Sequence, residues 1–539
     1  MKKYIAFFAL ICTMRAFGQD YSVLKNKQQN SLQSHNIRIP AEWEEVQAVV
    51  VSWPFLSHTE KNDPKEVAEY YKKYAAVWVK LAAAVQEECA LWIRVYKAED
   101  TVSVKSLLKE SGVALDHYKF IVYPGDNFWM RDYGPIGFYY GERDSIGLID
   151  TRYRTPSANY YTDAFPAEIS RIMNAKPFKT KLIYDGGNFK TDGFGNSFFT
   201  SRVFSNNTRQ NIWSQAATLD TMHSVFNFRS ATEVQALECD GGTGHIDMFF
   251  ELLDEQTIAL AEYPETVTAQ DRAILERNKK ILESQLSIYG TPYKIVRIPM
   301  PASDNGSFKN ITCAELNRDP RTYMNGVFVN KSYILPIFSN NTSGNSQGDA
   351  EVVALFKKLL PGYKIVPVDS RILSASFGGL HCITMQIPAE NPIHFRMKDF
   401  PLEKMPLAES YPVSVEISNK DKVKTAKLST RKRGSDWASQ FLMLNQRGSI
   451  NPKLLAGEKI FRGEIEGSTL AVGDTVDYYI SAESYNGKLM TKPITAPAGY
   501  YSFVITELGG EFGEYILNPS YKAMLALAFY GGSRNSLRE

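Results

Sequence analysis

The apolar pattern of this chain changes once, close to residue 400. Before that point, short apolar strands such as Val46 to Trp53 alternate with amphipathic helices, and this alternation predicts an α/β architecture. The segment from Lys398 to Pro412 is rich in proline, lysine and glutamate and is expected to be a linker. Beyond it, the alternation of Val413, Val415 and Ile417 with polar residues predicts a small all-β sandwich. The chain is therefore expected to contain two folds of different class.

The chain start and the charge balance limit the function classes. A basic start followed by the apolar run Tyr4 to Met14 is typical of a signal peptide, here residues 1–18, so the mature protein is expected to be periplasmic, cell-surface or secreted. Lys and Arg total 61 against 59 Asp and Glu, which gives no basic field for nucleic acid. The apolar stretch Tyr515 to Tyr530 is short and contains Pro519, so no transmembrane segment is expected.

A lone cysteine closes the segment Gly378-Gly379-Leu380-His381-Cys382. A nearby base raises the thiolate fraction of a cysteine and makes it a nucleophile. In an extended segment adjacent side chains point to opposite faces, so His381 is poorly placed to serve the sulfur of Cys382. His245 is the better candidate base, because Asp247, two residues later on a strand, shares its face and puts a carboxylate beside the imidazole.

The segment from Gly125 to Pro135 adds a clue to the substrate, because it is dense in aromatic, charged and turn residues. If Asp132 and Asp247 both face the cysteine, the pocket holds two carboxylates and favours a planar cation with several N–H donors, a guanidinium. The ring face of Trp129 would suit the same cation. The structural alternatives are core packing for Trp129 and an ion pair between Asp132 and Arg131.

Four cysteines remain once the signal peptide is removed: Cys89, Cys239, Cys313 and Cys382. If Cys382 is the nucleophile, at most one disulfide can form among the other three, and its pairing stays open. Cys239, His245 and Asp247 could be read as a metal cluster, but no second cysteine or histidine lies at ligand spacing, so no metal is expected.

The segments WMRDYGP, GGNFKTDG, GHID, YMNG and GGLHCIT follow one another in this order between Ile39 and Pro388. They resemble the agmatine deiminase and bacterial (Porphyromonas-type) peptidylarginine deiminase family of guanidine-modifying enzymes. The resemblance implies a pentein fold, a five-fold pseudosymmetric α/β propeller, and hydrolysis of a guanidinium to a ureido group with release of ammonia, without a cofactor. We therefore expect a pentein catalytic domain over residues 36–398, an immunoglobulin-like β-sandwich over 411–506 and a tail over 507–539.

The resemblance also implies a role for each matching residue. Cys382 would attack the guanidinium carbon, and His245 would protonate the departing ammonia and then activate water. Asp132 and Asp247 would hold the guanidinium nitrogens. Asn325, in YMNG, matches an asparagine that lies beside the catalytic cysteine in the peptidylarginine branch.

The sequence leaves the substrate open. The signal peptide and the added sandwich resemble the peptidylarginine branch, in which two arginines hold the carboxylate of a C-terminal arginine. Arg152 and Arg154 are the candidates, with solvent-exposed strand arginines as the alternative. The two glycines of GGLHCIT resemble the agmatine branch instead. We expect conversion of peptidyl or free arginine to citrulline first and of agmatine to N-carbamoylputrescine second, with a secreted cysteine peptidase or a non-catalytic binding protein on a pentein fold as the alternatives from other classes.

Overall fold

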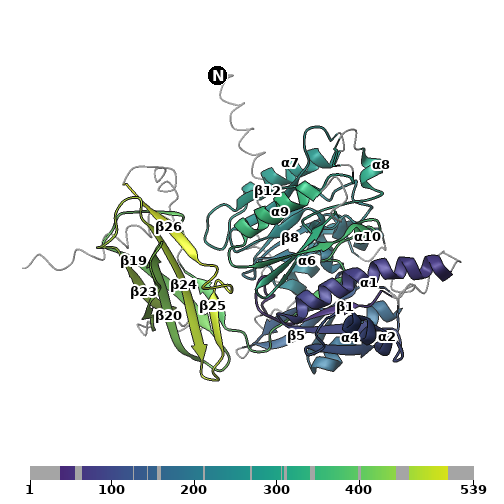
Figure 1. Cartoon of the computed structure of the whole chain (residues 1–539), viewed down its shortest axis with the longest axis horizontal. Helices are drawn as coiled ribbons and strands as arrows, with labels where there is room; N and C mark the ends of the chain where they lie inside the picture. The colour runs from purple at the N-terminus through teal and green to yellow at the C-terminus, as the bar shows by residue number, and fades with distance from the viewer. Residues whose placement is uncertain are drawn as a thin grey trace, which may run out of the picture.

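The computed structural model describes residues 37–54, 64–125, 127–141, 144–153, 160–209, 213–267, 270–304, 306–308, 312–339, 346–398, 402–444 and 460–507. Within them the chain forms an α/β unit followed by an all-β unit, which lie side by side in Figure 1. The predicted signal peptide, Arg154 and the tail beyond residue 507 lie outside the described residues.

Within the described residues, the α/β unit contains five small sheets that repeat one pattern. In four of them an antiparallel pair of strands is extended by a third strand in parallel. These four sheets are β4 (Ile136–Tyr140), β5 (Ser145–Arg152) and β6 (Lys176–Ile183); β7 (Lys190–Thr191), β8 (Asn196–Thr200) and β9 (Ser230–Val234); β10 (Phe250–Leu252), β11 (Thr257–Glu262) and β12 (Lys294–Pro299); and β13 (Val327–Val329), β14 (Ser332–Ile337) and β15 (Lys364–Asp369).

The fifth sheet joins the two ends of the α/β unit. Its strands are ordered β16 (Thr384–Pro388), β1 (Val46–Ser52), β2 (Ala90–Val95) and β3 (Tyr118–Val122). The last strand of the unit, β16, thus pairs antiparallel with the first, β1, and Thr384 lies opposite Val51. The predicted α/β class is confirmed, and the five repeats are the pattern that a pentein fold requires.

Helices connect the parallel strands of each sheet, since parallel neighbours need a long crossover connection. The buried residues Tyr74, Trp78, Leu81 and Val85 of the first helix form the stripe that packs on the fifth sheet. None of the helices in the described part of the chain is long and apolar enough to span a bilayer. The longer helices are α1 (Pro64–Gln86), α2 (Asp100–Glu110), α4 (Tyr160–Met173), α5 (Arg202–Arg209), α6 (Gln215–Phe226), α7 (Gln270–Glu283) and α9 (Ser346–Leu359). The shorter ones are α3 (Met130–Tyr133), α8 (Cys313–Leu316), α10 (Arg371–Ser374) and the 3₁₀ turns η3 (Gly186–Asn188) and η4 (Ile246–Met248).

The all-β unit begins earlier than the predicted boundary at residue 411. The last residues of the range expected to be the catalytic domain form β17 (His394–Met397), which pairs with β19 (Ser410–Ser418). The segment expected to be a linker contributes β18 (Lys404–Pro406), which pairs with β26 (Tyr501–Thr506). Short edge strands tolerate proline and charged residues, so their sequences lack the apolar alternation from which longer strands are predicted. The other strands are β20 (Val423–Lys432), β21 (Ala438–Phe441), β22 (Met443–Leu444), β23 (Ile460–Glu466), β24 (Thr475–Ser484) and β25 (Leu489–Lys492). They form two sheets around one apolar core.

Candidate active site

Cys382 lies in the turn that precedes β16, and its side chain is only 4% exposed. The buried Asn325 holds this turn, because its Oδ1 accepts a hydrogen bond from the backbone N–H of Cys382 at 3.3 Å and its Nδ2 donates to Sγ at 3.3 Å. A Cβ on Gly379 would lie 2.5 Å from Asn325 Oδ1, so only glycine permits this approach. The structure therefore places the predicted asparagine beside the predicted nucleophile.

His245 directly precedes the turn η4 and is buried. Its Nε2 lies 3.2 Å from Asp185 Oδ2, and its Nδ1 lies 3.6 Å from Asp132 Oδ1. Within the described residues, Nδ1 makes no hydrogen bond. Burial acts to lower the pKa of His245, but the neighbouring Asp132 and Asp185 outweigh it, so that this pKa lies above its ordinary value. The imidazole is thus suited to hold a proton in the free protein.

Two carboxylates, those of Asp132 in α3 and Asp247 in η4, lie beside this histidine. The Oδ2 atom of Asp247 is 3.6 Å from Cys382 Sγ, whereas its Oδ1 has no hydrogen-bond partner among the described residues. The expectation that His245 and Asp247 share one face of a strand is wrong, since the chain forms a 3₁₀ turn there. Within this tight turn the two side chains still converge.

Gly187, in the turn η3, marks the point where these groups meet. A Cβ at this residue would lie 2.8 Å from His245 Nδ1, 2.9 Å from Asp247 Oδ2 and 3.4 Å from Asp132 Oδ1. Glycine therefore allows one imidazole and two carboxylates to lie close together at this point, and Asp247 Oδ2 is also the oxygen that lies near the thiol.

The pKa of the Cys382 thiol indicates which charge on a ligand these neighbouring groups favour. Burial raises this pKa well above its ordinary value, and the charges of Asp247 and Asp132 raise it further. The thiol is therefore protonated at neutral pH in the free protein. A guanidinium held between the two carboxylates would offset their charge and lower the pKa of the thiol. Two buried carboxylates beside the thiol therefore favour a cationic ligand over a neutral or anionic one.

The remaining predicted residues are less directly placed. Trp129 is half-buried and packs on the cysteine loop, since a Cβ on Gly378 would lie 2.4 Å from its Cζ3. This contact matches the packing alternative, and stacking on a substrate stays a prediction. Arg152 ends β5 with an exposed side chain, which matches the alternative of a solvent-exposed strand arginine. Arg154 lies outside the described residues.

Two buried residues of the site were not predicted. Asp185 contacts His245, and it could have been found as an acidic residue that directly precedes a glycine pair just after a strand. His381 Nδ1 lies 2.8 Å from Asp247 Oδ2. The assumption of an extended backbone sets His381 aside, but residues 380–383 form a turn, from which its ring reaches Asp247 while its neighbour Cys382 approaches the same carboxylate.

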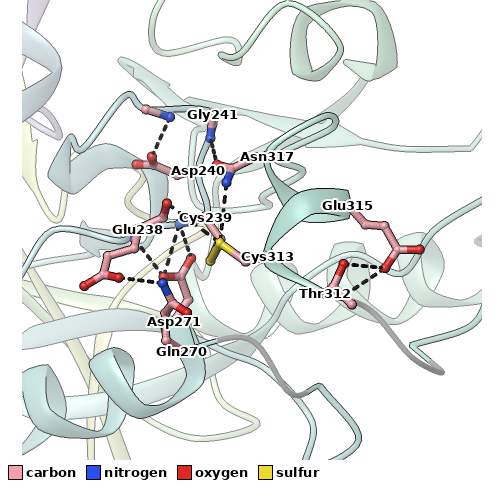
Figure 2. The surroundings of a disulfide bond; sticks show 11 residues. Glu238, Cys239, Asp240, Gly241, Gln270, Asp271, Thr312, Cys313, Glu315 and Asn317 are labelled. Atoms are coloured by element: carbon pink, nitrogen blue, oxygen red, sulfur yellow. Dashed lines mark hydrogen bonds between the residues drawn. A yellow bond between two sulfur atoms is a disulfide. The ribbon is translucent and has the colours of Figure 1, made fainter.

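A disulfide between Cys239 and Cys313 fixes the loop that leads to His245, and it resolves the pairing that the sequence left open (Figure 2). In this loop Asp240 accepts hydrogen bonds from two glycine N–H groups, at 3.1 and 2.7 Å, and Asn317 Oδ1 accepts one from a third, at 2.9 Å. The loop is therefore anchored to α8 both covalently and through hydrogen bonds.

Comparisons with known proteins agree on one group. Residues 38–388 match the family model described as Porphyromonas-type peptidyl-arginine deiminase. A Marinomonas sp. protein with the provisional name agmatine deiminase is 23% identical over 374 residues, which cover 65% of this chain and 94% of that protein. The solved structure of the agmatine deiminase of Enterococcus faecalis has a TM-score of 0.55 at 18% identity and covers 68% of this chain and 99% of its own.

A second solved structure, provisionally titled arginine deiminase from Porphyromonas gingivalis, has a TM-score of 0.54 at 20% identity and covers 65% of this chain and 98% of its own. At these identities the likeness concerns the fold. The α/β unit thus has the pentein-type fold of these enzymes.

Proposed function

Because the chain belongs to the Porphyromonas-type peptidyl-arginine deiminase family, and is thus a hydrolase of guanidino C–N bonds, we propose that Cys382 is its nucleophile and agmatine its first substrate. One observation carries the proposal: the thiol, His245 and the carboxylates of Asp132 and Asp247 lie close together around Gly187. Buried polar atoms without partners call for a ligand, and His245 Nδ1 and Asp247 Oδ1 are such atoms within the described residues.

The geometry supports a reaction in two halves. Asp132 and Asp247 hold the planar cation with its central carbon over Sγ. The bound cation lowers the pKa of the thiol, which gives its proton to solvent. The S–C bond forms, the C–N bond to one terminal nitrogen breaks, and the protonated His245 gives its proton to that nitrogen, which leaves as ammonia. Water then adds to the thiouronium carbon while the neutral His245 takes one of its protons. The C–S bond breaks, the remaining hydroxyl proton passes to the sulfur, and the ureido product leaves the restored thiol.

Asp185 would hold the ring of His245 in place during both halves, since it contacts the nitrogen that faces away from Asp132. General acid–base help of this kind contributes about 10²–10⁴-fold to the rate.

Agmatine is placed first because the relatives and solved structures that resemble the chain carry that name. In addition, Arg152 is exposed, and nothing in its placement favours a clamp for a substrate carboxylate. The second candidate is the arginine of a peptide, or free arginine, giving citrulline. The description of the matching family model and the added β unit favour this candidate.

We also propose that the protein is exported through the predicted signal peptide and that the β unit is an immunoglobulin-like sandwich that serves as a packing partner. The disulfide between Cys239 and Cys313 supports export, because disulfides persist in oxidising compartments. Two facing sheets with one shared core support the sandwich. Cell fractionation with an antibody against the β unit tests export, and protein confined to the cytoplasm would contradict it.

The function is tested by incubating the purified protein with agmatine, free arginine, and peptides with an internal or a C-terminal arginine. Ammonia, ureido product and peptide cleavage are measured for each. The highest kcat/KM for agmatine would support the first candidate, and the highest for a peptide would support the second. Peptide cleavage without ammonia would indicate a cysteine peptidase, and binding without turnover would indicate a binding protein.

A further inference from the structure

A string of buried ionisable groups runs from the candidate site into the core of the α/β unit. It starts at Asp247 and continues through His381 to Glu42 and Lys190, and it ends at Glu251. The side chains of His381, Lys190 and Glu251 are at most 1% exposed. Burying charges costs free energy unless each has a close partner, and removing one partner is strongly destabilising. The proposed mechanism uses only Asp247 from this string.

His381 is the link between the site and the rest of the string. Its Nδ1 lies 2.8 Å from Asp247 Oδ2, and its Nε2 lies 2.8 Å from Glu42 Oε1 and 3.2 Å from Lys190 Nζ. A carboxylate oxygen accepts hydrogen bonds, so Nδ1 carries a hydrogen and donates it to Asp247. The partners of Nε2 hold the ring from its other edge.

Because of the contact with His381, the two carboxylate oxygens of Asp247 have different surroundings. Oδ2 is fixed by the ring and faces the thiol of Cys382 at 3.6 Å, while Oδ1 is left without a hydrogen bond in the described structure. Burial acts to raise the pKa of Asp247, but the hydrogen bond and charge of His381 hold it below its ordinary value. Without this donor, the burial of Asp247 and the nearby carboxylate of Asp132 would both favour the protonated form of Asp247.

We propose that His381 is a positioning residue for the guanidinium site: it acts through Asp247, which it holds oriented toward the substrate cation, and it is itself held by Glu42 and Lys190. The inference rests on the proposed function for the identity of the cation. In this role His381, the neighbour of the proposed nucleophile, neither contacts the substrate nor transfers a proton.

Two isosteric substitutions separate the contacts of the ring. In His381→Asn the side-chain amide lies where Nδ1 lies, so the donor to Asp247 is kept and the contact with Glu42 is lost. In His381→Gln the amide lies where Nε2 lies, so the contact with Glu42 is kept and the donor to Asp247 is lost. Both variants keep a polar side chain in the buried string: His381→Gln loses the contact with Asp247, and His381→Asn loses those with Glu42 and Lys190.

Binding is measured by calorimetry in a Cys382→Ala background, with agmatine as the probe and a peptide ending in arginine as the second probe. We expect His381→Gln to raise the Kd about 10- to 100-fold, since a hydrogen bond to a charged group is lost. His381→Asn keeps the donor to Asp247 but loses the groups that hold the ring, so it should raise the Kd by clearly less than His381→Gln does, about three- to tenfold. Equal losses in both variants, a reversed order, or no binding of either probe would overturn the inference.

A double-mutant cycle provides a second measurement. If His381 acts through Asp247, His381→Gln in an Asp247→Asn background should weaken binding by less than about twofold. An additive loss there would indicate a merely structural role. Ammonia release is assayed separately with protein in which Cys382 is intact. If this protein releases no ammonia but binding still depends on His381, only the proposed deimination is refuted. If it releases ammonia but His381→Gln binds as tightly as the parent, only the positioning role is refuted.

Discussion

Gly187→Ala should remove activity while it leaves the fold intact. The added Cβ would lie 2.8 Å from His245 Nδ1 and 2.9 Å from Asp247 Oδ2, about 0.5 Å inside an ordinary contact. Gly187 does not have a left-handed φ, so alanine fits the backbone there. Both side chains must move away from the added Cβ, which displaces the groups proposed to hold and protonate the substrate. Since a misplacement of about 1 Å can cost 10²-fold in rate, we expect kcat/KM to fall about 10²-fold or more, which corresponds to about 2.7 kcal/mol.

The neighbouring glycine supplies a matched control. A Cβ on Gly186 would lie 2.3 Å from the backbone oxygen of Arg131, which cannot turn aside as a side chain can. Gly186→Ala should therefore lower the free energy of unfolding by about 1–3 kcal/mol, as overpacking does.

The assay measures kcat/KM from ammonia release and Tm from thermal unfolding for both variants and the wild type. We expect Gly187→Ala to lose activity at a Tm close to that of the wild type, and Gly186→Ala to have the lower Tm. A Gly187→Ala protein that keeps kcat/KM within about threefold of the wild type, or that unfolds at a lower temperature than Gly186→Ala, would refute the convergence of groups beside this glycine.

Other predictions concern the thiol, the carboxylate and the disulfide. Cys382→Ala should abolish ammonia release with a Tm near that of the wild type, and persistent release would exclude Cys382 as nucleophile. Asp132→Asn should raise KM about tenfold or more, because one of two carboxylates that grip the cation is neutralised; steady-state kinetics show this, and an unchanged KM contradicts it. The pKa of the Cys382 thiol is raised, so its alkylation by iodoacetamide in the free protein should still accelerate above pH 9, and a plateau below that pH would contradict the burial argument. Replacing both Cys239 and Cys313 by serine opens a link across 74 residues and should lower the free energy of unfolding by up to about 4 kcal/mol, which urea denaturation measures; an unchanged midpoint would show that the link is not stabilising.

The main chemistry of the site could be predicted from the sequence because it is carried by short motifs. Cys382, His245, Asp132, Asp247 and Asn325 were all named from such segments, and the structure brings them together. Their convergence itself could not be predicted, because it depends on how separate sheets of the ring meet. Their catalytic roles stay proposals until the variants are assayed.

The wrong strand assignment and the two site residues that the sequence did not predict have identifiable structural causes. The assumption of extended backbone failed at residues 245–248 and 380–383, where 3₁₀ and other turns set the side-chain directions and give His381 its contact with Asp247. Asp185 directly precedes the turn η3, and its contact with His245, 60 residues away in the sequence, depends on how two separate turns meet. The partner of Cys239 depends on long-range packing, and spacing alone cannot supply it.

The pairing of β16 with β1 has a consequence for when the enzyme becomes active during synthesis. The proposed nucleophile, Cys382, lies directly before β16, the last strand of the α/β unit. A chain synthesised only up to this point lacks both Cys382 and the strand that pairs with β1. If Cys382 is the nucleophile, translation products truncated before it cannot carry out the reaction, which first becomes possible once β16 is present to pair with β1.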